Sequence, residues 1–262
     1  MNAELLQSAI EAARQAGQAI LGHYRKIGSV QMKDDGSPLT LADLAAHQGI
    51  VGALSGSGIS VVSEESGDLY MSAVRYWLVD PLDGTKDFLA ANDEFTVNIA
   101  LIEDARPVLG VVLAPALDEM YAGGPSISSW REKHGVRTSC TRAVKSETCR
   151  MAVSRFHNHP DVDLFAAANG IAERTAIGSA LKYGRLATAE VDFFPRLVGS
   201  SEWDTAAGQA VLEGAGGQVL DWGTGEPLCY GKPRRRNPRL LSIRSPYVYT
   251  DFILRKYDTE IP

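Results

Sequence analysis

The chain has 262 residues, enough for one large domain or two packed ones, and its 45% hydrophobic and 22% charged residues are typical of a globular protein. Its net charge of −6 argues against non-specific nucleic-acid binding, which requires basic side chains that neutralise phosphates. The sequence contains no run of about 18 apolar residues, so it predicts no membrane-spanning helix.

The N-terminal stretch and the cysteines indicate where the protein acts. Glu4 and Glu11 interrupt the apolar pattern of the first residues, and there is no basic start, so this stretch does not resemble a secretory signal. The three cysteines have neither CxxC nor metal-like spacing, which predicts free thiols in a reducing compartment. These features together predict a cytoplasmic protein.

The first half of the chain begins with helical patterns and continues with strand patterns. Apolar residues recur at helical spacing over 3–25 and predict an amphipathic helix. A second helix is predicted over 37–54, with Thr40 as its N-cap and Asp43 three residues on, a variant of the capping box. Strands are then predicted at 59–62, 76–80, 95–102, 107–113 and 119–122. The last three are joined by short turns, which favours an antiparallel meander.

From about residue 150 strand and helix patterns alternate, which predicts a layered second half. Strands are predicted at 151–155, 174–178, 191–196, 218–222 and 240–243, and helices at 161–170, 179–190, 202–217 and 245–257. The change of pattern places a boundary between 138 and 150. The sequence therefore predicts an α+β protein with domains 1–145 and 146–262.

Acidic residues stand at the ends of predicted elements. Glu64 follows one strand, Asp80 and Asp83 follow the next, and Asp204 lies near the start of a helix in the second half. Two carboxylates about 4 Å apart repel by roughly 4 kcal/mol at an effective dielectric near 20, so such a cluster needs compensation. Mg²⁺ prefers oxygen ligands, and two such ions would neutralise four carboxylates.

The stretch WLVDPLDGTKDF, residues 77–88, adds a phosphate site to these acids. Pro81 fixes its own φ and keeps Asp80 extended, so a DPLD turn can direct both aspartates and the Leu82 carbonyl inward. Backbone N–H groups at Gly84 and Thr85 can then bind an anion. Acids at strand ends are usually solvated, and Asp-Gly is a common turn, but the combination favours a site for metals and phosphate.

WLVDPLDGTKDF and the later WDTAAG together resemble the paired signatures of the inositol monophosphatase superfamily of Mg²⁺-dependent, lithium-sensitive phosphatases. The resemblance covers nearly the whole chain. TKDF at 85–88, FTVNIAL at 95–101, SRFH at 154–157, GSALKY at 178–183 and the loop KPRRRNPR before the last strand are similar to the bacterial 3′(2′),5′-bisphosphate nucleotidase branch. The resemblance implies a layered αβαβα, sugar-phosphatase-like α+β fold, and the branch implies a role in sulfur assimilation.

The resemblance also implies roles for individual residues. The expected metal ligands, for two or more Mg²⁺ ions, are Glu64, Asp80, the Leu82 carbonyl, Asp83 and Asp204. The expected catalytic residues are Asp43, Glu64 and Thr85, of which Thr85 and Asp43 orient and deprotonate the attacking water. The expected substrate-binding residues are Glu64, Gly84, Thr85, Lys86, Ser179, Lys182, Arg196 and Asp204.

Several of these residues have a second interpretation. Asp43 is well placed to cap a helix, which is worth about 0.5–1 kcal/mol. Lys182 lies inside a predicted helix, where lysines are usually solvated. For His157 the resemblance implies a position near the nucleotide, and the alternative is an ordinary surface histidine. The loop Arg234–Arg236 reads as a charged surface loop or as the place where one arginine meets a distal phosphate.

The sequence thus predicts an enzyme that hydrolyses the 3′-phosphate of adenosine 3′,5′-bisphosphate to AMP and phosphate by metal-activated water. An acyl phosphate on Asp83 is left open. The alternatives are an inositol or other small sugar phosphatase, and an inactive metal-dependent phospho-ligand binding protein. The expected partner is the small-molecule nucleotide, with no nucleic acid and no integral membrane segment. The protein is expected to be a monomer or homodimer in the cytoplasm, and the resemblance leaves peripheral inner-membrane association open.

Overall fold

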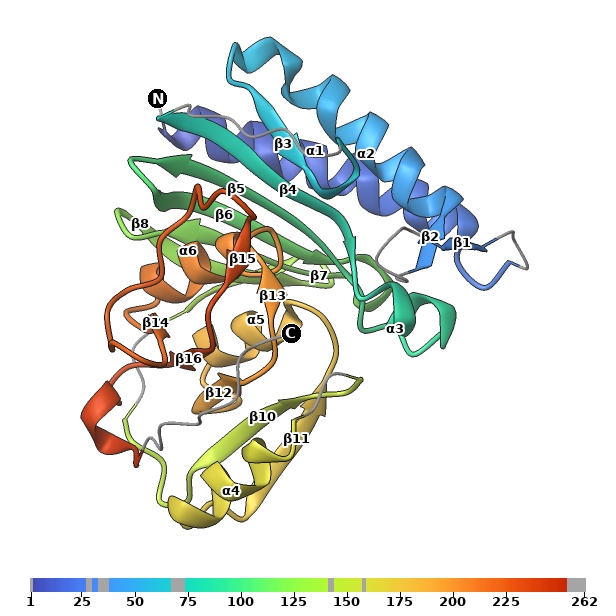
Figure 1. The fold of residues 1–262 in the computed structure, drawn as a ribbon. Coiled ribbons are helices and arrows are strands. Elements are labelled where there is room, and N and C mark those ends of the chain that lie inside the picture. Colours follow the sequence, from blue (N-terminus) through green and yellow to red (C-terminus); the bar gives the residue numbers. More distant parts are fainter. Residues whose placement is uncertain are drawn as a thin grey trace.

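The computed structural model describes residues 2–26, 30–32, 38–66, 74–140, 144–156 and 159–253, whose elements stack in five layers (Figure 1). The outer layer holds α1 (Asn2–His23) and α2 (Leu41–Leu54), and a large sheet lies beneath it. The middle layer holds α5 (Leu181–Ala187) and α6 (Ala206–Gly214), followed by a smaller sheet and α4 (Asp161–Ala168). The predicted αβαβα layering of an α+β protein is confirmed.

The large sheet has seven strands in the order of the chain. They are β3 (Val61–Ser63), β4 (Arg75–Asp83), β5 (Thr96–Glu103), β6 (Arg106–Ala114), β7 (Glu119–Gly124), β8 (Ile127–Lys133) and β9 (Val136–Ser139). β3 and β4 are parallel, and every later pair is antiparallel. The predicted meander is confirmed, and β8 and β9 extend it beyond the strands that the sequence predicted.

The small sheet has the order β11-β10-β12-β16-β14. These strands are β10 (Arg150–Ser154), β11 (Glu173–Ile177), β12 (Phe193–Arg196), β14 (Gln218–Asp221) and β16 (Leu240–Ile243). β10 pairs in parallel with β11 and β12, whereas β16 is antiparallel to both of its neighbours. The shorter elements are β1 (Val30–Met32), β2 (Pro38–Thr40), α3 (Thr85–Leu89), β13 (Ser200–Ser201), β15 (Arg236–Asn237) and the 3₁₀ turns at 55–57, 64–66, 115–117 and 249–251.

Three apolar clusters hold the layers together. The first lies between α1, α2 and the large sheet and includes the fully buried Trp77 and Phe95. The second, around Tyr121 and Leu212, lies on the opposite face of the large sheet, against α5 and α6. Because α6 contacts β6 as well as β14, the middle layer joins both sheets. The division into domains 1–145 and 146–262 therefore stays a prediction.

The helix predicted over 245–257 is wrong for the part of it that is described. Residues 245–253 contain only a 3₁₀ turn, Tyr249–Asp251, and residues 254–257 lie outside the described ranges. Tyr247 and Phe252 pack into the third apolar cluster, beside Phe165 of α4 and Phe193 of β12. Packing of single aromatic side chains thus outweighs the local helical preference.

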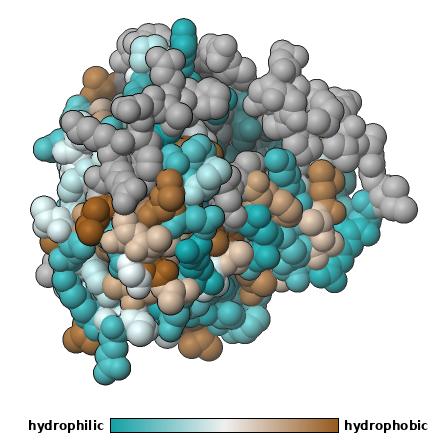
Figure 2. Space-filling model, turned by 60° about the horizontal axis from the view of Figure 1, so that its bottom comes forward, coloured by the Kyte–Doolittle hydropathy of each residue, from teal (hydrophilic) through white to brown (hydrophobic). Residues whose placement is uncertain are grey.

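The surface of the protein and its cysteines agree with the sequence-based predictions. On the face seen in Figure 2, hydrophobic side chains lie singly or in small groups among hydrophilic ones, as on most globular proteins. Among the described residues, no helix combines the length and apolar character that crossing a bilayer requires. Cys140, Cys149 and Cys229 are all free, as the sequence predicted.

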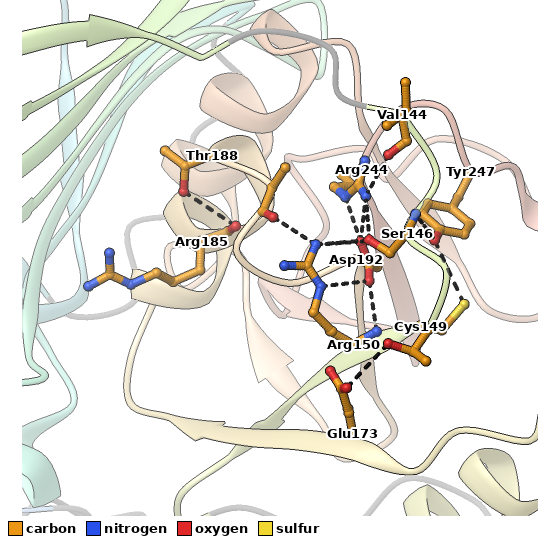
Figure 3. A network of polar contacts seen from close by, with 12 residues as sticks. Val144, Ser146, Cys149, Arg150, Glu173, Arg185, Thr188, Asp192, Arg244 and Tyr247 are labelled. Atoms are coloured by element: carbon orange, nitrogen blue, oxygen red, sulfur yellow. Dashed lines mark hydrogen bonds and ion pairs between the residues drawn. The ribbon is translucent and has the colours of Figure 1, made fainter.

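A buried ionic network fastens the small sheet to the segment that leads into it (Figure 3). The carboxylate of Asp192 accepts hydrogen bonds from Arg150 Nε at 3.1 Å, Arg244 Nε at 2.7 Å and Ser146 Oγ at 3.0 Å. Burial alone would raise the pKa of Asp192, but the hydrogen bonds from Arg150 and Arg244 outweigh burial and lower the pKa. The network therefore stabilises the ionised carboxylate.

Asp192→Asn is expected to lower the free energy of unfolding by about 3–5 kcal/mol, because it leaves the buried Arg244 without its anionic partner. An unfolded aspartate has a pKa of about 3.9, and that of folded Asp192 is lower. The wild-type stabilisation is therefore present above about pH 4 and is lost as pH falls through the folded pKa. Chemical denaturation at several pH values measures both effects.

The matched control is Asp163→Asn, which breaks an exposed ion pair with Arg174. Exposed pairs contribute about 0–1 kcal/mol, so this variant should unfold nearly as the wild type does. Equal losses in the two variants would contradict the structural role assigned to Asp192.

Candidate active site

The acidic residues singled out in the sequence come from separate segments and line one cavity of about 380 Å³, within the size range of small-ligand pockets. Ser63 of β3 pairs in parallel with Val79 of β4, so Glu64, which follows β3, and Asp80 of β4 lie at the same end of this strand pair. Asp83 ends β4, and Asp204 lies two residues before α6. The fold thus brings four carboxylates from three segments to one place.

β4 continues through Pro81 to Asp83, whereas the sequence predicted a strand that ends at Asp80 and a turn after it. The pairing with β5 shifts register between Asp80 and Asp83, which makes this part of β4 a β-bulge. Pro81 cannot donate to the ladder, and Leu82 N donates to Asp80 Oδ1 at 3.1 Å instead. A bulge re-aims side chains, and here it brings both aspartates to the cavity wall.

Negative charge accumulates at this end of the cavity. Burial raises the pKa of Asp80 well above its ordinary value, and the charges of Glu64, Asp83 and Asp204 raise it further. Burial and the Asp83 charge raise the pKa of Asp204 to about 7. A cation or a proton must offset this mutual repulsion.

Donors beside the aspartates orient their carboxylates. Asp83 Oδ2 accepts from Ala180 N at 2.6 Å, and Asp204 Oδ2 accepts from Ser201 N at 3.0 Å. In the part of the chain that the structure describes, no three or more His, Cys, Asp or Glu side chains are arranged, as they stand, to hold one metal ion. The donor set of carboxylates and the Leu82 carbonyl is nevertheless all oxygen, which suits Mg²⁺. These residues fit Mg²⁺ in their donor chemistry, and all of them line the same cavity.

The turn after β4 is built for close approach to the backbone. Gly84 has φ 85° and ψ 43°, a left-handed conformation that glycine adopts readily, and α3 begins at the next residue. A Cβ at Gly84 would lie 3.1 Å from Cβ of Ser179. The Thr85 hydroxyl donates to the Leu82 carbonyl at 3.4 Å. Gly84 and Thr85 both line the cavity, where an anion can reach their amides.

The loop 178–180 of the second half is fastened to the first half beside this turn. Gly178 N donates to Glu94 Oε2 at 2.7 Å, and Ala180 N donates to Asp83. Arg155 Nη2 donates to the same Glu94 oxygen at 2.6 Å. Charge-assisted bonds of this kind are stronger than neutral ones, so they hold the start of α5 against the cavity.

Basic side chains line the same cavity. Lys182 is the second residue of α5 and only 3% exposed, so the interpretation of a solvated lysine inside a helix is wrong. Its Nζ donates to the Ile177 carbonyl at 3.0 Å and lies 5.1 Å from the centre of the Phe194 ring. Burial, followed by the charge of Arg196, lowers the pKa of Lys182 to about 8. Lys182 and Arg196 therefore give the cavity a cationic region.

Nearly all the site residues singled out in the sequence reach this cavity. Those that line it are Glu64, Asp80, Leu82, Asp83, Gly84, Thr85, Lys86, Ser179, Lys182, Arg196 and Asp204. Asp43 does not line it. Location does not by itself assign a chemical role, so the roles stay predictions.

Residues 1–249 match the Inositol monophosphatase family. The chain belongs to this family. The 3′(2′),5′-bisphosphate nucleotidase CysQ of Escherichia coli is 40% identical over 236 residues, covering 86% of this chain and 94% of that protein. The protein of the same name from Salmonella typhimurium is 41% identical over the same shares. The crystal structure of CysQ from Bacteroides thetaiotaomicron has a TM-score of 0.83 and 33% identity, and covers 93% of this chain and 98% of that one.

Among the family residues expected from the sequence, Asp43 is placed as a helix cap. Its Oδ2 accepts from Thr40 N at 2.7 Å and from Thr40 Oγ1 at 2.6 Å, and Thr40 Oγ1 accepts from Ala42 N at 3.2 Å. The predicted capping box is therefore confirmed. β2, which ends at Thr40, contacts α3, which begins at Thr85, so the capped start of α2 lies near the turn at Gly84. Its role in water activation stays a prediction.

Other cavity residues were not foreseen. They are Asp87, Ser154, Phe156, Tyr183, Phe194, Gly199, Ser200, Ser201, Trp203 and Thr205. Arg236, from the loop for which the sequence left two interpretations open, lines the cavity as well. Phe156 is 43% exposed, so the cavity wall carries an accessible aromatic ring. Phe156 belongs to the motif SRFH, in which the histidine was the predicted candidate. That histidine, His157, lies outside the described residues.

Proposed function

We propose that the protein is a Mg²⁺-dependent phosphomonoesterase that removes the 3′-phosphate of adenosine 3′,5′-bisphosphate and releases AMP and phosphate. The observation that carries this proposal is one cavity that joins a group of carboxylates to buried and exposed basic side chains. The carboxylates suit divalent cations, and the basic side chains suit a substrate with more than one phosphate. The nucleotidase names of the Escherichia coli and Salmonella relatives support the same substrate.

Two Mg²⁺ ions would be held by the carboxylates of Glu64, Asp80, Asp83 and Asp204 and by the Leu82 carbonyl. When bound, such ions polarise phosphoryl oxygens and lower the pKa of water. The chain's own residues position the ester. The amides of Gly84 and Thr85 bind the scissile phosphate, while the Thr85 hydroxyl and Asp43 orient the attacking water and Asp43 takes its proton.

An inositol or other sugar phosphatase on the same scaffold is the alternative within the family. Lys182 and Arg236 both line the cavity. Two basic side chains favour a substrate with a second phosphate over a monophosphate whose leaving group is an uncharged polyol. The exposed ring of Phe156 offers a face on which a planar base can stack. An inactive protein that only binds phospho-ligands is the alternative of another class, and the full set of acids argues against it.

The purified protein is expected to release phosphate from adenosine 3′,5′-bisphosphate faster than from inositol 1-phosphate, with Mg²⁺ present. Removal of Mg²⁺ by EDTA should abolish both activities, because the carboxylates then lack the cations that couple them to the ester. Li⁺ should inhibit, as the resemblance implies. Inorganic phosphate release with both substrates, with and without each ion, is the measurement.

Faster turnover of the inositol ester would replace the proposed substrate with the alternative one. No phosphate release from any ester, with Mg²⁺ bound in a calorimetric titration, would favour the inactive binding protein. We also propose that the enzyme works in the cytoplasm as a monomer or homodimer. Cell fractionation and sedimentation of the purified protein test these two statements.

A further inference from the structure

The three consecutive arginines before the last strand have different environments. Arg235 is buried, with its Nη1 3.3 Å from Glu202 Oε2 and its guanidinium 5.5 Å from the centre of the Tyr76 ring. Arg234 is exposed and does not line the cavity. Arg236 is exposed and lines the cavity that contains the carboxylates. Of the three arginines, all of which are described, Arg236 alone lines the cavity.

The backbone of Arg236 is fixed to the segment that carries one of the acids. β15 pairs antiparallel with β13, with Arg236 opposite Ser201. Asn237 Nδ2 reinforces this pair by donating to the Ser201 carbonyl at 2.7 Å and to Thr205 Oγ1 at 3.0 Å. Ser201 N in turn donates to Asp204. The position of Arg236 relative to Asp204 is thus set by main-chain pairing.

The side chain of Arg236 remains available for an anion. Within the described part of the chain its hydrogen bond is a long one, from Nη1 to Ser201 Oγ at 3.4 Å, and most of the five guanidinium N–H groups are left for a ligand. Arg196, on the wall of the same cavity, has a buried Nε with no hydrogen-bond partner among the described residues. Two guanidinium groups without strong partners among the described residues line the cavity that also contains the carboxylates, and they indicate a second anion subsite.

We propose that Arg236 binds the phosphate of the substrate that is not hydrolysed, the 5′-phosphate of adenosine 3′,5′-bisphosphate. This inference rests on the proposed function. A planar guanidinium binds phosphate oxygens through two parallel N–H···O bonds, and Arg236 reaches the cavity from a rigid strand pair. Arg236 thereby selects a bisphosphate over a monophosphate.

The test compares Arg236→Ala with Arg234→Ala, using adenosine 3′,5′-bisphosphate and adenosine 3′-monophosphate as substrates with Mg²⁺. Arg236→Ala is expected to lower the ratio of kcat/KM for the bisphosphate to that for the monophosphate about tenfold to a hundredfold, mainly through KM. Arg236→Lys should recover part of this ratio, because it keeps the charge and loses the two-point geometry. Arg234→Ala, in the same loop, should keep the wild-type ratio.

Each other outcome has a definite meaning. An unchanged ratio in Arg236→Ala overturns the inference while the wild-type nucleotidase activity keeps the proposed function intact. An equal fall of the bisphosphate-to-monophosphate ratio of kcat/KM in Arg236→Ala and Arg234→Ala also overturns the inference, because the effect would then come from the charge of the whole loop. A wild type that hydrolyses neither nucleotide overturns the proposed function itself.

Discussion

Asp83→Asn is expected to lower kcat/KM with Mg²⁺ at least about a thousandfold, since a metal's stabilisation of the transition state is worth several kcal/mol and each 1.36 kcal/mol is tenfold. The fold should survive. In the wild type, Ala180 N, Asn98 Nδ2 and the Thr96 hydroxyl all donate to Asp83 Oδ2. An asparagine carbonyl oxygen at the same position accepts all three bonds. The substitution therefore changes only the position of Oδ1, where an amide NH₂ group replaces the carboxylate oxygen.

Thermal unfolding without metal provides the second measurement on this variant. Asp83→Asn removes one charge from the group of carboxylates and should unfold at or above the wild-type temperature, because repulsion with Asp80 and Asp204 is relieved. Asp83→Ala is the matched variant, and it leaves Ala180 N without its acceptor. It should lose about 1–3 kcal/mol of stability as well as activity. Wild-type activity in Asp83→Asn, or its unfolding without metal, would contradict the proposed metal site.

The elements that the sequence predicted well carry their signal locally. The helical spacing of apolar residues over 3–25 corresponds to the buried face of α1, including Ala9, Ala13 and Ile20. Residues 77–79 are apolar because this part of β4 is buried on both faces. Where one short motif contains both the buried strand and the polar group that follows it, as in WLVDPLDGTKDF, the site could be predicted together with the strand.

β8 and β9 have no such signal. All four residues of β9 are exposed, and in β8 only Ser129 is buried, so neither strand shows an alternating apolar pattern. They form because β7 offers an unpaired edge, whose backbone groups gain hydrogen bonds from any strand that follows. This pairing depends on the neighbouring strand, so the spacing of apolar residues in β8 and β9 does not predict it.

The site also combines residues that a local motif predicts with contacts that depend on distant segments. The metal-binding acids lie in motifs, whereas the bond from Gly178 N to Glu94 joins residues 84 positions apart. Arg235 and Arg236 are neighbours of the same type, yet one is buried against Glu202 and the other lines the cavity. Strand pairing between β13 and β15 decides which of them meets the cavity, and no local pattern encodes that pairing.

Asp43→Asn is expected to lower kcat about a hundredfold or more while KM changes little, since general-base catalysis contributes about 10²–10⁴-fold. The amide oxygen of asparagine can still accept from Thr40 N, so α2 keeps most of its cap. The variant therefore removes the basicity of residue 43 and preserves its structural contact. Steady-state kinetics and a denaturation curve on the same preparation separate the two roles.

Thr40→Ala provides the complementary change. It removes the hydroxyl that donates to Asp43 and accepts from Ala42 N, and should cost about 1 kcal/mol of stability. Its kcat should fall far less than that of Asp43→Asn, because the carboxylate remains. If Asp43→Asn instead kept the wild-type kcat and lost only stability, the capping box would be the whole function of this aspartate. The attacking water would then need another base among the cavity residues, and Glu64, beside Asp80, would be the first to replace.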